Sequence, residues 1–348
     1  MSGAGAAPAD RSAEATRMYV EAGEAADAVA RALERNAPTL ARIAGRLRSH
    51  SPLSVTTCAR GSSDAAATYA KYLVETLIGA PTSSAAPSVA SVYSAPVRPA
   101  HRLCLAISQS GRSPDLLRSV QAHKDAGGYV VALVNDTASP LADLADELLA
   151  MEAAPERSVA ATKSFIASLA LLAALLAAWS DRPDLQRGLQ ALPDALRQAF
   201  ARDWPEVREM LRPAASAFVL GRGYGLAAAQ EAALKLKEAC GLHAEAFSSA
   251  EVRHGPMALV GPDFPVLAFA SSDPAGDDVR AVADEFRGRG ARVAVSDVGG
   301  LLPASPVRPM LEPIVQIQGF YRLVNALSIA RGFDPDAPPH LRKVTTTT

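Results

Sequence analysis

The sequence predicts a doubly wound α/β protein with two parallel sheets, and three observations support this fold class. Short apolar runs at 53–59, 103–107 and 129–134 alternate with helical patterns, which is typical of βαβ units. Residues 59–67 align with residues 221–229, and each segment follows a short apolar strand. The chain has 348 residues, enough for two domains that each bury a core. A duplicated α/β domain accounts for all three observations.

The expected elements follow in order along the chain. A helix from 17 to 35 is expected to end at Asn36-Ala37-Pro38, and a short helix at 42–47 leads to the strand 53–59. An Ala-rich helix then runs to about residue 77, and strand-like runs follow at 88–92 and 103–107. A helix at 116–126, a strand at 129–134 and a buried helix at 165–179 complete the first domain. We therefore expect an N-terminal helical extension (1–35), a first domain (36–182), a helical connector (183–213), a second domain (214–333) and a C-terminal tail (334–348).

Composition excludes several classes of function. The 35 basic and 36 acidic residues give a formal net charge of −1, which argues against nucleic-acid or membrane partners. The apolar run 165–179 is shorter than the roughly 20 residues that a membrane span needs, and residues 1–10 do not resemble a secretory signal. Three widely separated cysteines are expected to be buried thiols of a cytoplasmic protein: Cys58, Cys104 and Cys240.

Residues 108–113 are the strongest candidate for a binding loop. An apolar strand ends here in Ser108-Gln109-Ser110-Gly111, and a helical segment follows Ser113. In a parallel sheet, ligands bind at the carboxyl ends of strands. Hydroxyl groups, backbone N–H groups and a helix N-terminus can together hold an anion there without Lys or Arg. The alternative is an ordinary strand-to-helix loop with a serine cap.

Acid–base residues cluster in the second half of the chain. Glu231, Lys235 and Glu238 have the spacing of one helix face. They could form an ordinary surface ion-pair ladder, although their Ala and Leu neighbours indicate that part of this helix is buried. His254 lies at a Gly-Pro turn, where its side chain could be catalytic or merely structural. The spacing of His243 and Glu245 is too sparse for a metal site.

The C-terminal tail and a glycine-rich segment also bear on the function. Two prolines stiffen the tail before Lys343, which could enter a pocket as a charge or as an amine nucleophile. The segment Gly221-Arg222-Gly223 is similar to a dinucleotide fingerprint, but Leu226 stands where that fingerprint needs Gly or Ala. We therefore expect no nicotinamide, no other cofactor and no metal.

Taken together, these motifs resemble the sugar isomerase (SIS) superfamily. The similarity is greatest to the isomerase portion of glutamine–fructose-6-phosphate aminotransferases and to the SIS-type glucosamine-6-phosphate deaminases. It covers roughly residues 20–348, and the family's motifs occur in the family's order: Ser-Gln-Ser-Gly, Val-Ala-x-Thr-Lys, Ala-Leu-Lys-Leu-Lys-Glu, His-Ala-Glu-Ala, Arg-His-Gly-Pro and Lys-Val-Thr. The resemblance implies two tandem SIS domains, each a flavodoxin-like five-stranded parallel sheet flanked by helices.

The resemblance also implies a role for individual residues. In the family, Glu238 would move a proton between C1 and C2 of the sugar, and His254 would open the ring from across a dimer interface. Lys343 would form a Schiff base with the ketose, with Lys235 supporting the same site. Ala161 stands where the family has serine, which removes one hydrogen bond to the sugar. The residues implied to bind the substrate or its phosphate are Ser63, Ser108, Gln109, Ser110, Ser113, Val159, Ala161 and Lys235.

One difference from the aminotransferases decides the activity that we expect. The aminotransferases carry a glutaminase domain ahead of their SIS pair, whereas only some 50 residues precede the first expected SIS strand in this sequence. We therefore expect a homodimeric glucosamine-6-phosphate deaminase with a shared active site and a small amino-sugar phosphate as its partner. Deglycation of a fructosamine 6-phosphate and deamination of galactosamine 6-phosphate stay open, as does a non-catalytic sugar-phosphate sensor.

Overall fold

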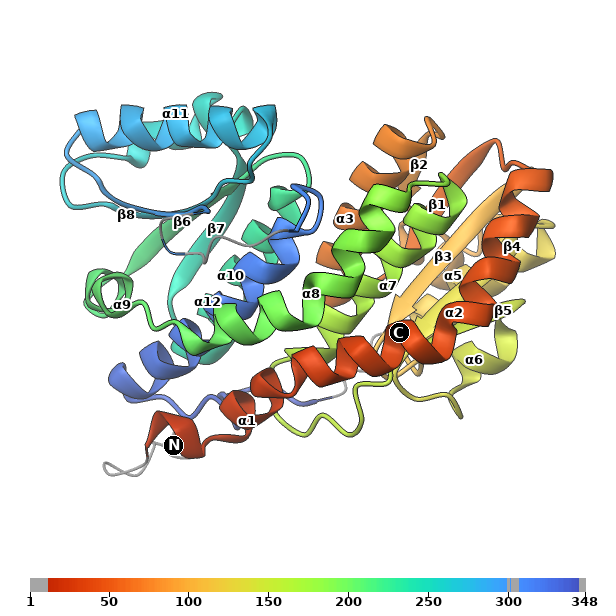
Figure 1. Cartoon of the computed structure of the whole chain (residues 1–348), viewed down its shortest axis with the longest axis horizontal. Coiled ribbons are helices and arrows are strands. Elements are labelled where there is room, and N and C mark those ends of the chain that lie inside the picture. Colours follow the sequence, from red (N-terminus) through yellow and green to blue (C-terminus); the bar gives the residue numbers. More distant parts are fainter. Residues whose placement is uncertain (1–11, 299–300, 302–306, 344–348) are drawn as a thin grey trace. The chain divides into compact units, whose positions relative to one another are not determined.

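The computed structural model describes residues 12–298, 301 and 307–343 (Figure 1). The chain divides into two compact units, and each is described by itself. The first-sheet unit comprises residues 27–155 and 164–190, and the second-sheet unit comprises residues 12–26, 156–163 and 191–343. Each unit is built around one parallel sheet, which confirms the expected fold class.

The first-sheet unit holds five parallel strands in the order β2-β1-β3-β4-β5. Its strands are β1 Ser54–Cys58, β2 Thr82–Ser84, β3 Arg102–Ser108, β4 Tyr129–Val134 and β5 Glu147–Ala150. Its helices are α2 Ala25–Ser49, which begins in the second-sheet unit, α3 Ser62–Leu77, α4 Pro87–Ser91, α5 Pro114–Asp125, α6 Pro140–Leu144 and α7 Lys163–Trp179. Because β1 and β3 are neighbours with connections leaving in opposite directions, their carboxyl ends form a topological switch point, where ligands bind in such sheets.

The second-sheet unit holds four parallel strands in the order β7-β6-β8-β9. Its strands are β6 Ser216–Gly221, β7 His243–Ser248, β8 Pro265–Phe269 and β9 Arg292–Ser296. Its helices are α1 Arg17–Gly23, α9 Pro205–Leu211, α10 Gly225–Cys240, α11 Pro274–Gly288 and α12 Glu312–Ala330, with 3₁₀ turns η1 Ala13–Ala15, η2 Glu251–Arg253 and η3 Pro256–Leu259. Helix α8, Pro183–Ala201, runs from the first-sheet unit into this one.

The internal repeat is visible in the strand order. The first four strands of each unit are arranged alike, with β1 and β6 second in the row and followed by α3 and α10. The aligned segments 59–67 and 221–229 are these two strand-to-helix turns. We expected five strands in each domain, but the second-sheet unit shows four among the described residues. The chain after β9 passes through 299–300 and 302–306, which lie outside those residues, before it reaches α12.

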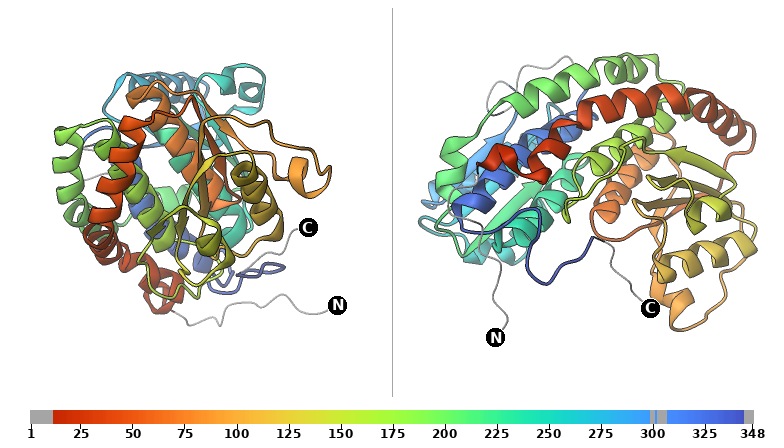
Figure 2. Two further views of the ribbon diagram at one scale, coloured as in Figure 1. Left: turned by 90° about the vertical axis from the view of Figure 1, so that its right-hand side faces the viewer. Right: turned by 90° about the horizontal axis from the view of Figure 1, so that it is seen from below.

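Two expected elements were wrong. Helix α2 does not end at Asn36-Ala37-Pro38 but continues through Pro38 to Ser49 (Figure 2). The buried positions Val29, Ala32 and Ile43 continue at helical spacing across the proline, which is itself exposed. The run at 88–92 forms the short helix α4 rather than a strand, because Pro87 occupies the first helical position and favours helix initiation.

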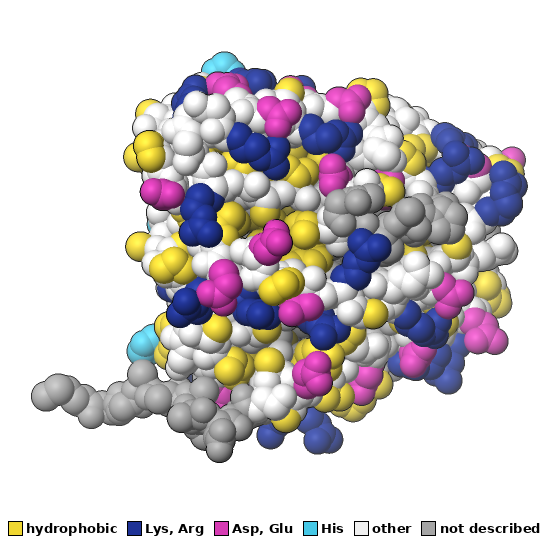
Figure 3. All heavy atoms as spheres, turned by 60° about the vertical axis from the view of Figure 1, so that its left-hand side comes forward, with side chains coloured by type: hydrophobic (Ala, Val, Ile, Leu, Met, Phe, Trp, Pro, Cys, Tyr) yellow, Lys and Arg dark blue, Asp and Glu magenta, His cyan; other side chains and the backbone are white. Residues whose placement is uncertain are grey.

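Other expectations were confirmed. Helix α7 is buried on all sides, and no helix among the described residues is long and apolar enough to span a membrane. Residues 183–213 are helical, and they contain α8 and α9. Cys58, Cys104 and Cys240 are all free and buried. Figure 3 shows acidic and basic side chains interspersed on one face, in line with the balanced composition.

We expect Asn36→Ala to destabilise the first-sheet unit by about 2–3 kcal/mol, because it leaves buried backbone groups unpaired. The Asn36 side chain donates to the carbonyls of Ala32 (2.7 Å) and Ala150 (2.9 Å) and accepts from the Ala150 N–H (3.0 Å). Urea unfolding would measure the loss, with the exposed Glu34→Ala on the same helix as the control. Equal stability of the two variants would contradict this role for Asn36.

Candidate active site

The loop after β3 forms a compact turn at the carboxyl edge of the first sheet. Ser108 accepts a hydrogen bond from the Gly111 N–H (3.1 Å). Gly111 has φ +62°, and a Cβ there would lie 2.2 Å from the Ser139 hydroxyl, so only glycine fits. Cys58 at the end of β1 pairs with Ala106 on β3, which brings the start of α3 and its residue Ser63 to the same edge.

This loop has the character of a neutral anion cradle. Ser113 occupies the N-cap position of α5, yet its side chain makes no capping hydrogen bond. Among the described residues, neither Ser110 nor Ser113 uses its hydroxyl in a hydrogen bond within the protein. The nearby guanidinium groups are already paired, Arg60 with Asp115 (2.9 Å) and Arg112 with Asp136 (2.7 Å). The groups that this loop leaves for a ligand are hydroxyls, an amide side chain and the N-terminus of α5.

In the second-sheet unit, the acid–base face of α10 is buried rather than solvated. Lys235 is completely buried, and its Nζ lies 2.7 Å from Glu238 Oε2 and 3.3 Å from Glu231 Oε1. Burial by itself would lower the pKa of Lys235, but the two carboxylates outweigh it and the pKa is raised. Lys235 is therefore a permanent ammonium that orients Glu238. The Glu238 side chain is 23% exposed and so can still reach a ligand.

Tyr321 on α12 belongs to this cluster, although the sequence analysis missed it. Its hydroxyl donates to Glu231 Oε1 at 2.8 Å and is fully buried. Burial first, then the charge of Glu231, raises its pKa well above 10, with smaller contributions from Glu156 and Glu238. Tyr321 is thus a neutral donor surrounded by three carboxylates. Little in the sequence indicated this role, because α12 also carries other polar side chains such as Gln316, Gln318 and Asn325.

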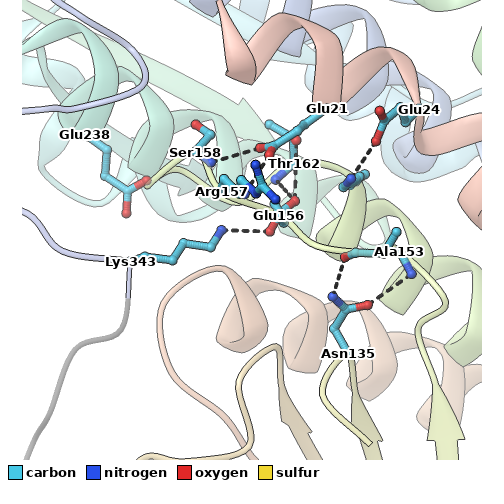
Figure 4. Close-up of polar contacts among 12 residues, drawn as sticks. Glu21, Glu24, Asn135, Ala153, Glu156, Arg157, Ser158, Thr162, Glu238 and Lys343 are labelled. Carbon is cyan, nitrogen blue, oxygen red and sulfur yellow. Dashed lines mark hydrogen bonds and ion pairs between the residues drawn. The ribbon is translucent and has the colours of Figure 1, made fainter.

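The segment 156–163, which contains the Val-Ala-x-Thr-Lys motif, is held by two carboxylates (Figure 4). Glu21 of α1 accepts from the backbone N–H groups of Arg157 (2.6 Å) and Ser158 (3.0 Å). Glu156 accepts from the Thr162 N–H at 2.9 Å. Between these anchors, residues 159 and 161 are half-buried, so their backbone is held in place with access to solvent.

Lys343 reaches this segment from the tail. Its Nζ lies 2.9 Å from Glu156 Oε2, whose side chain is fully buried (Figure 4). Asp336 secures the start of the tail by accepting from the N–H groups of Arg17 (2.9 Å) and Met18 (2.8 Å). The structure therefore gives Lys343 a fixed position. Its partner is Glu156, which was not among the site residues expected from the sequence. The rest of the expected tail motif, from 344 onwards, lies outside the described residues.

His254 stands apart from this cluster. It is exposed between η2 and η3, and Gly255 after it has φ +130°. Within the described part of the second-sheet unit, no hydrogen bond or ion pair joins it to α10. His243 and Glu245 on β7 are also exposed. The structure thus brings Lys235 and Glu238 together with Glu231 and Tyr321, places Lys343 on Glu156, and leaves His254 on the surface.

Comparison with known proteins identifies the family. The SIS domain family matches residues 50–178 and 210–296, which include both sheets. The chain belongs to the SIS family. A solved structure provisionally assigned as a phosphosugar isomerase, from Silicibacter pomeroyi DSS-3, is 44% identical with a TM-score of 0.85 and covers 92% of this chain and 100% of its own.

Other relatives are aminotransferases. This SIS protein is 38% identical over 262 residues to the isomerizing glutamine–fructose-6-phosphate aminotransferase of Pyrobaculum aerophilum, covering 70% of this chain and 43% of that one. The Zymomonas mobilis enzyme of the same name is 35% identical over 315 residues, covering 84% and 52%. The chain therefore spans about half the length of the curated relatives it matches. Glucosamine-6-phosphate deaminase from Thermotoga maritima, at 22% identity and a TM-score of 0.77, shares the fold and covers 95% of this chain and 100% of its own.

We expect Tyr321→Phe to change how the stability of the second-sheet unit depends on alkaline pH. The folded pKa of Tyr321 is above its unfolded value of 10, so its contribution is fully present below pH 10 and is lost as the pH rises. The stability difference between wild type and Tyr321→Phe should therefore shrink between about pH 8.5 and about pH 11.

Urea unfolding of both proteins at the two pH values provides the measurement. The exposed Tyr93→Phe serves as the matched control and should show a constant difference from wild type. A constant difference for Tyr321→Phe as well would mean that its hydroxyl is not buried against carboxylates.

Proposed function

We propose that this SIS protein is an amino-sugar phosphate isomerase that acts as a glucosamine-6-phosphate deaminase. It would convert glucosamine 6-phosphate and water into fructose 6-phosphate and ammonia. The observation that carries this proposal is the position of Glu238, a partly exposed carboxylate fixed by the buried Lys235 ammonium. Proton transfer between adjacent carbons needs one base whose carboxylate is held in place and open to the substrate.

The cradle at 108–113 would bind the phosphate of the substrate. Ser110 and Ser113 offer hydroxyls that bond to none of the described residues, and the N-terminus of α5 favours negative charge. A phosphate bound there is remote from the reacting carbons, and its binding energy would orient them. Because the cradle contributes no unpaired cation, the affinity would come from directed hydrogen bonds.

The chemistry would begin with ring opening and proton transfer. His254 would pass the proton of the anomeric hydroxyl to the ring oxygen, giving the open-chain aldehyde. Glu238 would then remove the proton from C2 to form an enolamine, and return it to C1. The product is a C2 imine of the ketose, which water hydrolyses to fructose 6-phosphate with release of ammonia.

Lys343 would supply positive charge in this scheme. Its ammonium is paired with the buried Glu156 and lies in the unit that carries Glu238. To form a Schiff base with the ketose, Lys343 would have to leave Glu156 and lose its proton. The structure therefore favours a charge that stabilises the enolamine oxygen, while the Schiff base stays an alternative.

The comparisons support the reaction class more strongly than the substrate. The aminotransferase relatives are named as isomerizing enzymes that use fructose 6-phosphate. The same proton transfer serves synthesis and breakdown of an amino sugar, so the degradative direction and the choice of glucosamine are our proposal. Galactosamine 6-phosphate and fructosamine 6-phosphate share the same phosphate handle and are the alternatives to test.

We expect the wild type to release ammonia from glucosamine 6-phosphate and Glu238→Gln to lose about 10²- to 10⁴-fold of kcat. Ammonia release should be measured over a panel containing the three amino-sugar phosphates. Deuterium exchange at C2 in heavy water should be lost in the same variant. Glu209→Gln, at an exposed position of α9, is the matched control.

Each outcome of this experiment tests a different part of the proposal. Exchange at C2 with ammonia released only from another sugar would keep the reaction class and replace the substrate. Binding of sugar phosphates without exchange or ammonia would identify a sensor. Full activity of Glu238→Gln would exclude Glu238 as the base.

We further propose that the enzyme is a homodimer in which His254 serves the site of the partner subunit. The exposed position of His254, away from the α10 cluster of its own unit, supports this arrangement. Mixing unfolded Glu238→Gln and His254→Ala chains and refolding them should restore about a quarter of wild-type activity, since half of the dimers would contain one intact site. If both residues act within one chain, the mixture will stay as inactive as its components.

A further inference from the structure

A second candidate site lies at the opposite edge of the first sheet from the 108–113 loop. A cavity of about 330 Å³ opens where β3, β4 and β5 begin, beside the last turns of α2 and α5. This volume falls within the range of roughly 300–1,000 Å³ that is usual for metabolite sites. The cavity lies wholly within the first-sheet unit, and none of the residues assigned above to the SIS reaction lines it.

The cavity has an excess of basic side chains. Its acids are already neutralised: Asp146 pairs with Lys124 (3.1 Å), and Glu147 pairs with Arg42 (2.5 Å) outside the cavity. Arg46 and Arg102 have no acidic partner among the described residues. The basic side chains that line the cavity are Arg46, His50, His101, Arg102 and Lys124.

Two buried polar atoms in the wall have no hydrogen-bond partner within the described residues. They are Arg102 Nε and the Tyr129 hydroxyl. Tyr129 pairs with Leu103 in the β3–β4 register, so Arg102, one position earlier on β3, points to the opposite face at the same edge of the sheet. Both residues line the cavity, which extends around this edge from α2 to α5. Leaving such a group unsatisfied costs about 1–3 kcal/mol, so a ligand that offers an acceptor oxygen to each of them would be stabilising.

Arg102 Nε and the Tyr129 hydroxyl are both hydrogen-bond donors. Burial first, then the charge of Glu147, raises the pKa of Tyr129 to about 12, so its hydroxyl keeps its proton. The Arg46 guanidinium covers the Tyr129 ring at 4.1 Å from its centroid and fixes the ring. A Cβ at Gly128 would lie 2.8 Å from the His123 carbonyl and 3.4 Å from Arg102 Cγ, so this glycine lets Arg102 lie along the wall.

We propose that this cavity binds a small polyanion, whose phosphoryl or carboxylate oxygens accept hydrogen bonds from Arg102 Nε and the Tyr129 hydroxyl. The ammonium of Lys124 and the imidazoles of His50 and His101 add donors at its rim. A divalent or trivalent anion matches the two uncompensated guanidinium groups. The site is separate from the substrate cradle, and its occupation does not depend on the function proposed above.

The test is calorimetric titration of the full chain with pyrophosphate and, separately, with citrate, at constant ionic strength because salt screens exposed charges. We expect at least one of the two anions to bind. Arg102→Met should weaken that binding at least tenfold, and Tyr129→Phe, which keeps the ring under Arg46, about fivefold. Binding of pyrophosphate alone would identify a phosphoryl ligand, and binding of citrate alone a carboxylate ligand.

Matched variants make the result specific. Arg98→Met removes the same charge from an exposed position outside the cavity and should leave the affinity unchanged. An anion held by the 108–113 cradle would respond to Ser110→Ala and not to Arg102→Met or Tyr129→Phe. If neither anion binds at millimolar concentration, or if binding is the same in Arg102→Met, Tyr129→Phe and wild type, the proposal is wrong. Thermal unfolding of each variant shows that it is folded.

Discussion

The ammonium of Lys235, buried between Glu231 and Glu238, is the interaction on which the candidate active site depends. A buried charge costs several kcal/mol unless it is paired and hydrogen-bonded, so the three groups can only be buried together. Lys235 thereby keeps two carboxylates on one helix face, and Tyr321 donates a further hydrogen bond to Glu231. One member of the cluster, Glu238, keeps part of its side chain exposed, which makes it the member suited to act on a ligand.

The two units share a fold but differ in the groups that their corresponding loops leave for an anionic ligand. In the first-sheet unit, the hydroxyls of Ser110 and Ser113 in the loop after β3 make no hydrogen bond to any residue that the structure describes. In the second-sheet unit, the loop after β8 is occupied by the chain's own carboxylates: the Ser272 N–H donates to Glu312 (2.6 Å) and the Ser271 hydroxyl to Asp273 (2.7 Å). A carboxylate of the protein thus takes the place that an anionic ligand could take in the second-sheet unit, whereas the Ser110 and Ser113 hydroxyls of the first-sheet unit bond to none of the described residues.

The second-sheet unit also shows how distant segments complete a site. Residues 12–26 and 156–163 belong to it, although the chain between them forms the other unit. Glu21 holds the backbone at Arg157 and Ser158, and Glu156 holds Lys343 from the far end of the sequence. These contacts convert a terminal tail, which local sequence would leave frayed, into a positioned part of the candidate active site.

The sequence by itself determined the parallel α/β architecture, its duplication, the loop at 108–113 and the helix face that carries Lys235 and Glu238. These features are local, because they depend on periodicity and on turn residues within a few positions. Only the tertiary structure decided that α2 continues through Pro38, where long-range packing and the Asn36 side chain outweigh the local cost of a proline. Only the tertiary structure brought Glu21, Glu156 and Tyr321 to the site, because hydrogen bonds between residues 90 or more positions apart leave no pattern in a single sequence.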